Sequence, residues 1–239
     1  MTIGADIYGG LDPRDVPVSR VPEAARYLSL PSSTLRAWTF GQKNRDELFR
    51  RVIDPQDQEN GLLSFKNLVE AHVLSALRAH HHIPLPRIRR AIDYLSQLTG
   101  KDRPLVDLPL MTDGASVFVR AVDEGILDAS SRGQLAIEAF VAAYLKRVEA
   151  DESGVIRLFP FTRKRELIEP VELRRQPKVV VIDPRISFGR PVLVRTNIRT
   201  AVVAQRYLAG ESIEDLAKDY RRSPLEIEEA IRCEVPAAA

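Results

Sequence analysis

Apolar residues recur between residues 21 and 38 in a pattern that predicts two short helices joined by a tight turn. Pro31 ends the first helix, because the residue before a proline disfavours the helical region. Ser32 or Ser33 can begin the second helix by accepting a backbone N–H. The residues expected to face inward from the two helices are Ala24, Ala25, Leu28, Leu35 and Trp38.

The second of these helices presents short polar side chains and one arginine on its outer face. Arg36 and the two serines fall opposite the apolar stripe. A helix fits the major groove of DNA, and an arginine there can reach a guanine edge or a phosphate. The pair is therefore a candidate helix-turn-helix, and a plain helical hairpin is the structural alternative.

A short hairpin and two further helices are expected after this pair. The elements are a strand at 48–53, a turn at 54–61, a return strand at 62–63, and helices at 65–77 and from 88 onward. Ser64 is the expected cap of the first of these helices. Helix, turn, helix, basic hairpin and two helices together predict a winged helix-turn-helix.

The middle of the chain, residues 97–177, carries the weakest pattern. It predicts strands at 115–122, 134–137 and 155–159, and an amphipathic helix at 138–148. The segment from Pro160 to Pro177 combines prolines with arginines, so it is expected to be extended or linker-like. Such a segment could follow a phosphate backbone or hold a dimer partner, and both interpretations stay open.

The last quarter predicts a second helix-turn-helix-like unit. Strands at 179–182 and 190–194 precede three helices, which begin near Val202, after Ser212 and after Ser223. Both serines have an acidic residue three positions later, which is the spacing of a capping box. The acids expected on the exposed face of the last helix are Glu226, Glu228 and Glu229. That face would meet DNA phosphates with like charge, so the unit is interpreted as a packing or partner surface.

The formal net charge of +2 conceals an uneven distribution along the 239 residues. Residues 20–51 carry a net +4 and residues 160–200 a net +6, while the rest of the chain carries a net −8. Two basic stretches in an acidic background are compatible with a nucleic-acid binder, because patches and not totals bind DNA. Solvated surface charge is the alternative for either stretch alone.

Composition places the chain among ordinary globular proteins, with 44% hydrophobic and 28% charged residues. Its single cysteine, Cys233, excludes an intramolecular disulfide and a cysteine-cluster zinc site. The first six residues lack the pattern of a signal peptide, and no apolar run approaches the roughly 20 residues that span a bilayer. We therefore expect a cytoplasmic protein with no membrane partner.

Catalytic and metal-binding motifs are not evident. The triplet His80-His81-His82 falls where a helix should end, and histidine there can meet the negative helix end. No cysteine or carboxylate accompanies it at ligand spacing, so no metal site is expected. No glycine-rich phosphate loop, Ser/His/Asp arrangement or HExxH motif occurs. The expectation is a protein that is not an enzyme, with no catalytic residues and no cofactor.

Motifs in the N-terminal third point to a known family. They are Glu23-Ala24-Ala25-x-x-Leu28, Ser33-Thr34-Leu35-Arg36-x-Trp38, and the helix starts Leu63-Ser64-Phe65 and Ile83-Pro84-Leu85. Together they resemble the DNA-binding head of MerR-type regulators over residues 20–96. The long dimerisation helix usual in that family does not follow, and the wing is longer. The DNA-contacting positions that the resemblance implies are Ser33, Thr34, Arg36, Arg50 and Arg51.

Motifs in the last quarter point to a second family. They are Gly189-x-Pro191, Thr196, Ile198 and Gly210-x-Ser212-Ile213-Glu214-Asp215-Leu216. They resemble the domain-of-unknown-function family numbered 433, frequent in antitoxins, over residues 178–233. Arg195 and Asn197 stand where that family usually has glycine and arginine. Since glycine often supplies a positive φ, the geometry of this turn is an open point.

The two resemblances together indicate a VapB-type antitoxin of a toxin–antitoxin pair. They imply a PIN-type ribonuclease toxin as partner, neutralised by direct steric binding, and repression of the shared operon through a double-stranded DNA operator. A homodimer is expected, because dimers read paired half-sites. The alternative is a stand-alone MerR-like transcriptional regulator that senses a ligand through its middle region.

The expected fold class is α+β. The expected domains are an N-terminal winged helix-turn-helix (1–96), a small α/β connector with a basic, proline-rich linker (97–177), and a C-terminal trihelical, helix-turn-helix-like module with short strands (178–239).

Overall fold

The computed structural model describes residues 7–44, 47–81, 84–107, 115–116, 119–120, 131–163 and 169–235. The N-terminal elements are β1 (Ser19–Arg20), α1 (Val21–Tyr27), α2 (Ser32–Phe40), β2 (Gln42–Asn44), β3 (Glu47–Phe49), β4 (Leu62–Leu63), α3 (Phe65–His81), α4 (Leu85–Thr99) and α5 (Pro104–Asp107). The middle elements are α7 (Ser131–Leu145), β5 (Val148–Asp151), β6 (Gly154–Leu158) and α8 (Pro170–Arg175). The C-terminal elements are β7 (Val180–Val181), a 3-10 turn (Ser187–Gly189), β8 (Val192–Leu193), α9 (Thr200–Leu208), α10 (Ile213–Tyr220) and α11 (Pro224–Glu234).

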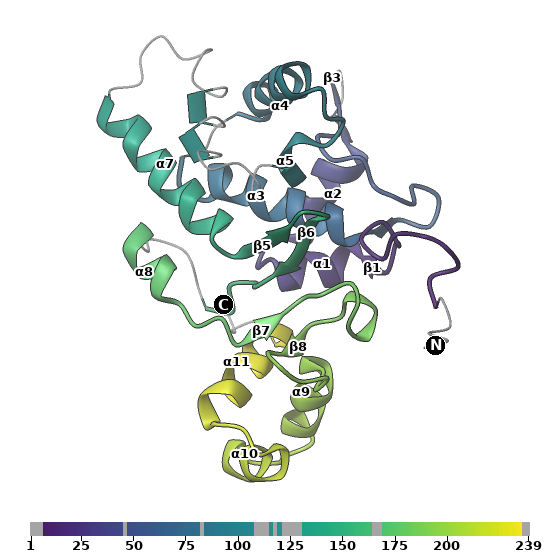
Figure 1. Cartoon of the computed structure of the whole chain (residues 1–239), viewed down its shortest axis with the longest axis vertical. Coiled ribbons are helices and arrows are strands. Elements are labelled where there is room, and N and C mark those ends of the chain that lie inside the picture. The colour runs from purple at the N-terminus through teal and green to yellow at the C-terminus, as the bar shows by residue number, and fades with distance from the viewer. Residues whose placement is uncertain are drawn as a thin grey trace.

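The described strands pair two by two, and every pair is antiparallel: β1 with β4, β2 with β3, β5 with β6, and β7 with β8. Helices form most of the molecule. In Figure 1, α9, α10 and α11 make a lower lobe, and the helices from α1 to α7 make the upper one. Helices with short strands in this arrangement confirm the expected α+β class. Within the described residues, no helix is long and apolar enough to span a membrane.

The main hydrophobic core runs through both lobes, from Val21 of α1 to Cys233 of α11, and a small second cluster holds Phe159, Val181 and Val192. Helix α3 lies at the centre of the main core and packs against α7 and α5. Apart from Lys66, every residue from Phe65 to Ala76 is buried, which suits a helix in the middle of a core. The buried His72 of α3 forms a 3.0 Å hydrogen bond between Nε2 and the Tyr144 carbonyl. His72 is therefore a core residue whose ring nitrogen has a partner.

The wing hairpin is not the one expected. Strand β3 pairs with β2, with Gln42 opposite Phe49, so the hairpin precedes the predicted turn at 54–61. The predicted return strand, β4, pairs instead with β1, with Leu62 opposite Arg20. The prediction was wrong because a short connection brings β2 and β3 together at once, whereas residues 54–61 lead back to the start of the domain. The two residues of that connection, 45 and 46, lie outside the described part of the chain.

The middle region is more helical than expected. Residues 134–137, predicted as a strand, belong to helix α7, which packs against α3. The expected helix at 138–148 therefore starts earlier, and it ends at Leu145, before Val148 begins β5. Residues 115–116 and 119–120 are helical where a strand was predicted, and the remainder of that segment lies outside the described residues. The predicted strand at 155–159 is confirmed as β6.

The segment from Pro160 to Pro177, which was expected to be a linker, is held at both ends by the buried side chain of Arg147. Arg147, 1% exposed, donates hydrogen bonds to the carbonyls of Pro160 (3.2 Å), Gln176 (3.0 Å) and Pro177 (3.2 Å). Its position away from water lowers the pKa of Arg147 to about 10. Helix α8 lies between these anchor points, so the two ends of the segment are fixed and part of it is helical.

The C-terminal helix caps are the ones expected. Ser212 Oγ accepts a 3.1 Å hydrogen bond from the Asp215 N–H. Ser223 and Glu226 form a full capping box, in which Glu226 also accepts a 2.9 Å bond from the Ser223 N–H. The local spacing of cap and acid thus determines where α10 and α11 begin.

The exposed acidic face predicted for α11 is wrong. Glu229 is fully buried, and its carboxylate accepts 2.7 Å hydrogen bonds from Arg163 and Arg232. Glu228 pairs with the same Arg232 at 2.9 Å, and Glu226 is engaged in the helix cap. Glu229 is buried because Arg163, 66 residues away in sequence, folds back onto the helix and pairs with it. Helix α11 is a packing helix that contacts α1, α9 and α10.

Two ion pairs fasten the C-terminal module to the first helix of the head. Arg190 pairs with Glu23 at 2.8 Å and also donates a 3.0 Å hydrogen bond to the Val18 carbonyl. Arg26 pairs with Glu234 at 2.8 Å. Both lobes therefore meet at α1.

Candidate DNA-binding face

The turn between α1 and α2 is tight and internally bonded. Ser29 adopts a left-handed conformation with φ 50°, and the Leu30 N–H returns to the Ala25 carbonyl at 2.8 Å. Helix α2 starts directly after Pro31, which stands at its N-cap without a side-chain hydrogen bond. The prediction that Ser32 or Ser33 caps this helix was wrong, because both lie inside its first turn.

Helix α2 has one buried face and one open face. Leu35 and Trp38 are buried as expected, and they fix the helix against the core. Ser33 and Arg36 are exposed, and Thr34 is half-buried. The guanidinium of Arg36 lies 5.9 Å from the ring centroid of Phe40, one turn further on. The outer face therefore offers hydroxyls and a positive charge on a rigid helix.

The other two predicted contact residues, Arg50 and Arg51, directly follow strand β3. Both are exposed. Arg51 forms an ion pair with Asp54, and the carbonyl of Arg50 accepts a hydrogen bond from Arg89 of α4. Helix α4 thus also reaches this segment, a contact that the sequence did not reveal.

The segment that begins at Arg50 is joined to the end of helix α2. The N–H groups of Val52 and Ile53 both donate to the Trp38 carbonyl, at 2.7 and 3.0 Å. The structure therefore connects the arginines after β3 to the helix that carries Ser33, Thr34 and Arg36. The predicted contact residues belong to one substructure, α2 with the strand pair and the segment that follows.

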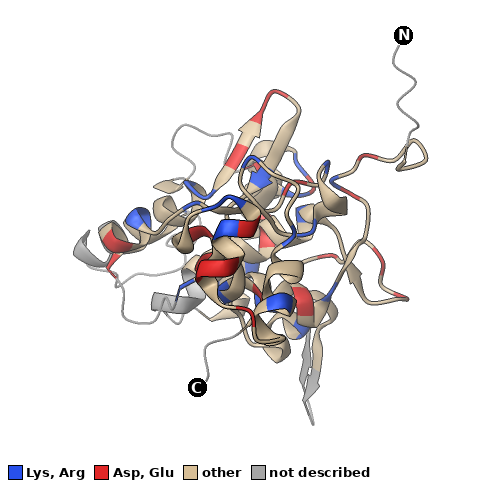
Figure 2. Cartoon of the chain, turned by 90° about the horizontal axis from the view of Figure 1, so that it is seen from below, with Lys and Arg blue, Asp and Glu red and all other residues tan. Residues whose placement is uncertain are grey.

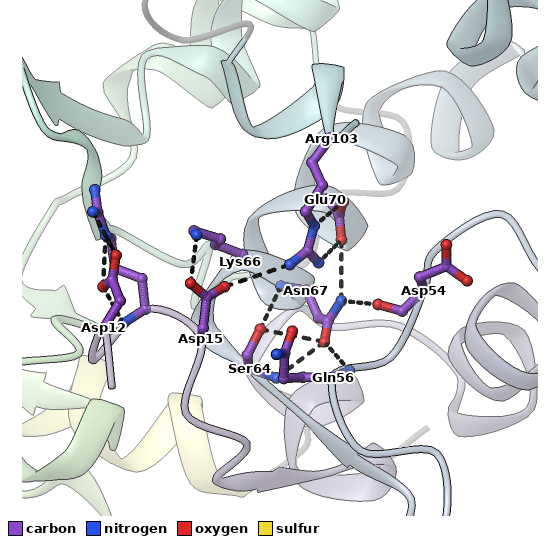
Figure 3. Close-up of polar contacts among 10 residues, drawn as sticks. Asp12, Asp15, Asp54, Gln56, Ser64, Lys66, Asn67, Glu70 and Arg103 are labelled. Carbon is purple, nitrogen blue, oxygen red and sulfur yellow. Dashed lines mark hydrogen bonds and ion pairs between the residues drawn. The ribbon is translucent and has the colours of Figure 1, made fainter. Parts of the chain in front are cut away.

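A buried side-chain amide holds the next part of this segment (Figure 3). Asn67 of α3 donates a 2.7 Å hydrogen bond to the Asp54 carbonyl. Its Oδ1 accepts from the Gln56 N–H at 3.0 Å and from the Ser64 N–H at 3.1 Å. One side chain thereby satisfies three backbone groups on the path from the wing to α3.

The side-chain amide of Asn67 also donates to Glu70, which forms a buried ion pair with Arg103. Glu70 accepts a 3.1 Å hydrogen bond from Asn67 Nδ2 and two from Arg103, at 2.9 and 2.6 Å. Burial would lower the pKa of Arg103, but Glu70 outweighs it, so that the pKa is raised and the guanidinium stays charged. Asp15 lies 3.7 Å from Arg103 and pairs with Lys66 at 2.7 Å, which ties down the N-terminal arm. Figure 3 shows side chains of the N-terminal arm and Arg103 meeting those of α3, beside the segment that holds Asp54 and Gln56.

Sequence reasoning missed this polar cluster, although one signal was present. Ser64 was recognised as a helix cap, and Asn67 stands three positions later, where a capping-box partner is expected. The reciprocal bonds exist: Asn67 N–H donates to Ser64 Oγ at 3.3 Å, and Asn67 Oδ1 accepts from the Ser64 N–H. Nothing in the spacing indicates that Arg103, 36 residues later, completes the cluster.

Charge elsewhere is largely balanced. Seen from below in Figure 2, Lys and Arg and Asp and Glu are interspersed over the molecule. On the C-terminal helices, Arg206 pairs with Glu211 and Asp219, and Arg232 pairs with Glu228. In the part of the chain that the structure describes, no group of three or more His, Cys, Asp or Glu residues could hold a metal ion. The side chains of His80 to His82 are outside that part.

Comparisons with known proteins agree with the two ends of this description. Residues 17–92, which hold α1 to most of α4, match a family described as "Putative DNA-binding HTH domain". Residues 180–232 match "Protein of unknown function (DUF433)". The second match is the family resemblance expected from the sequence. The first supports a DNA-binding helix-turn-helix in general terms.

Relatives over nearly the whole chain come from Mycobacterium tuberculosis strain H37Rv. The chain is 29% identical over 239 residues to "Putative antitoxin VapB45", and the match covers 91% of this chain and 93% of the relative. It is 24% identical over 218 residues to "Uncharacterized protein Rv2308", and that match covers 87% of this chain and 86% of the relative. The crystal structure of Rv2018 from Mycobacterium tuberculosis superposes with a TM-score of 0.66 at 26% identity, over 90% of this chain and 98% of that one.

Proposed function

We propose that this protein is a DNA-binding antitoxin that neutralises a cognate toxin by direct binding and represses its own operon. The observation that carries the proposal is a helix-turn-helix with an open polar face, in a chain that resembles an antitoxin along 91% of its length. Both likenesses are to binding proteins, which supports a function without catalysis.

The DNA-reading part of the proposal rests on α2. Ser33, Thr34 and Arg36 stand on a helix whose opposite face is locked into the core, so their positions are set before DNA arrives. Arg36 can form the two-pronged contact with a guanine edge that arginines commonly make in the major groove. Arg50 and Arg51, next to the strand pair, would contact phosphates. A homodimer would place two such heads on paired half-sites.

The toxin-binding part rests on the other lobe and on the basic stretch 160–200. Arg163 and Arg190 are committed to ion pairs with Glu229 and Glu23, so they serve the fold. Exposed arginines such as Arg195, in the turn before α9, are better placed to approach an acidic partner. We propose a PIN-type ribonuclease as that partner, since its metal-binding carboxylates would attract such side chains.

Co-expression with the adjacent gene tests the toxin half of the proposal. We expect the neighbour alone to arrest growth, the pair to grow normally, and the two proteins to purify together. The matched control is the neighbour expressed with a stop codon in this chain. A harmless neighbour, or a pair that does not copurify, contradicts the antitoxin proposal.

A gel-shift experiment with the upstream promoter tests the DNA half. We expect retardation of the promoter fragment, and weaker retardation of a fragment of equal length from inside the gene. The alternative is a stand-alone regulator that senses a ligand through the middle region. Promoter binding that a small molecule shifts, in the absence of any toxic neighbour, would favour that regulator.

A further inference from the structure

The segment that carries the wing arginines depends on side chains for its shape. Residues 50–61 are all described and form neither helix nor strand, apart from a bridge between Asp57 and Leu62. Fixing a backbone of this kind costs conformational entropy at every residue. Ordered contacts must offset that cost if Arg50 and Arg51 are to be held in place.

Asn67 supplies the central contact of this kind. Its side chain is completely buried, and both halves of the amide are engaged. The oxygen accepts from the N–H of Gln56 on one side and of Ser64 on the other. The nitrogen donates its two hydrogens to the Asp54 carbonyl and to Glu70. An amide offers two donors and two acceptor lone pairs, so the capacity of this one is fully used.

The orientation of the amide is set by the Glu70–Arg103 pair. A carboxylate can only accept, so Glu70 must face the NH2 half of Asn67, and the oxygen must face the loop. Arg103 holds that carboxylate with two hydrogen bonds from the turn before α5. The direction in which Asn67 presents its donor and acceptors to the wing segment is therefore fixed from within the core.

We propose that Asn67 is a positioning residue for DNA binding: it sets where Arg50 and Arg51 lie relative to helix α2, without touching DNA itself. The inference rests on the proposed function, since it assumes that these arginines contact phosphates. Arg89 holds the Arg50 carbonyl, and the anchor at Trp38 fixes residues 52 and 53. The bonds to Asp54 and Gln56 fix the next turn, so that Asp54 can hold Arg51 in an exposed position.

Salt dependence distinguishes positioning from simple stabilisation. Each phosphate neutralised by the protein contributes about 0.9 to the slope of log affinity against log salt, so loss of two contacts lowers the slope by about 2. The probe is a fluorescein-labelled 30-base-pair duplex of mixed sequence, titrated at several salt concentrations and followed by anisotropy. Variants are compared only where circular dichroism shows them folded.

The test uses Asn67→Ala, the pair Arg50→Ala and Arg51→Ala, and the three substitutions combined. We expect the arginine pair to lower the slope by about 2, and Asn67→Ala to lower it by between about 1 and 2. The combined variant should match the arginine pair, because Asn67 acts through those two arginines. Asp15→Asn is the matched control. It breaks the ion pairs to Lys66 and Arg103 but leaves the wing segment bonded, so the slope should not change.

Each failure has a distinct meaning. If the arginine pair lowers the slope and Asn67→Ala does not, or if their effects add, the positioning role is refuted and the proposed function stands. If the arginine pair leaves the slope unchanged, the wing contacts of the proposed function are refuted, and the inference with them. Should Asn67→Ala not fold, Asn67→Leu takes its place. It fills the space of the amide without adding a charge beside Glu70, it loses the bonds to Asp54 and Gln56, and the same slope criterion applies.

Discussion

Replacement of Arg195 by glycine should stabilise the protein. Arg195 adopts φ 61°, a left-handed conformation in which an L-residue carries a penalty of roughly 1–2 kcal/mol. The turn cannot relax, because Thr196 donates from its N–H (3.1 Å) and its hydroxyl (2.8 Å) to the Leu193 carbonyl. Ile198 in turn donates to Thr196 Oγ1 at 3.0 Å. The position is thus held in a conformation that suits glycine.

The expected gain follows from two opposing terms. Glycine relieves the left-handed penalty, but it costs about 0.5–1 kcal/mol more backbone entropy on folding. The net expectation for Arg195→Gly is about 0.5–1 kcal/mol of added stability. In urea, this should raise the midpoint of unfolding with no change in slope. In a thermal melt, a gain of this size corresponds to about 1–4 °C for a chain of this length.

Two controls separate backbone strain from loss of the guanidinium. Arg195→Ala removes the same charge but keeps a Cβ, so it should show no such gain. Arg199→Gly is placed four residues later, at the N-cap of α9, where φ is −70° and there is no left-handed strain to relieve. If Arg195→Gly is no more stable than Arg195→Ala, the strain argument is refuted.

Three further outcomes are expected. Arg36→Ala should weaken promoter binding by about 1–3 kcal/mol if Arg36 reads a base, and unchanged affinity at fixed salt would remove it from the contact set. Burial alone would raise the pKa of Glu23, but hydrogen bonds from Arg190 and from the Arg20 N–H outweigh it and lower that pKa. The stability Glu23 contributes is therefore present above its unfolded pKa and is lost as pH falls through its folded value. Urea midpoints between about pH 5 and pH 3 should decline less steeply in Glu23→Gln, and parallel curves would refute this. Sedimentation should show two copies of the chain per particle, both free and bound to DNA. One copy of the chain on DNA would contradict the proposed dimer.

Local patterns predicted helices at both ends of the chain. The apolar spacing of Leu35 and Trp38 placed α2, and the Ser223 capping box placed the start of α11. Interactions between neighbours along the chain determine both features, so a single sequence contains them.

Local patterns did not predict contacts between residues that are far apart in the sequence. Strand β4 has only two residues, and nothing near it indicates that Ser19 and Arg20 would be its partners. The apolar run 134–137 suits a strand as well as a buried helix, and packing against α3 decides the outcome. Glu229 was expected in water because its partner Arg163 arrives from a distant segment.

The ion pairs that join Arg190 to Glu23 and Arg26 to Glu234 bear on the design of truncated versions of this protein. The stretch 180–232 is a unit of homology, yet α11 covers α1, and Leu158 of β6 exchanges backbone bonds with Ile182. An isolated C-terminal fragment would expose the apolar side of α11, and an isolated head would leave Glu23 and Arg26 without their partners. The boundaries of the matched family therefore differ from the boundaries of the cooperative folding unit. Studies of DNA binding or toxin binding by a fragment should be compared with the intact chain.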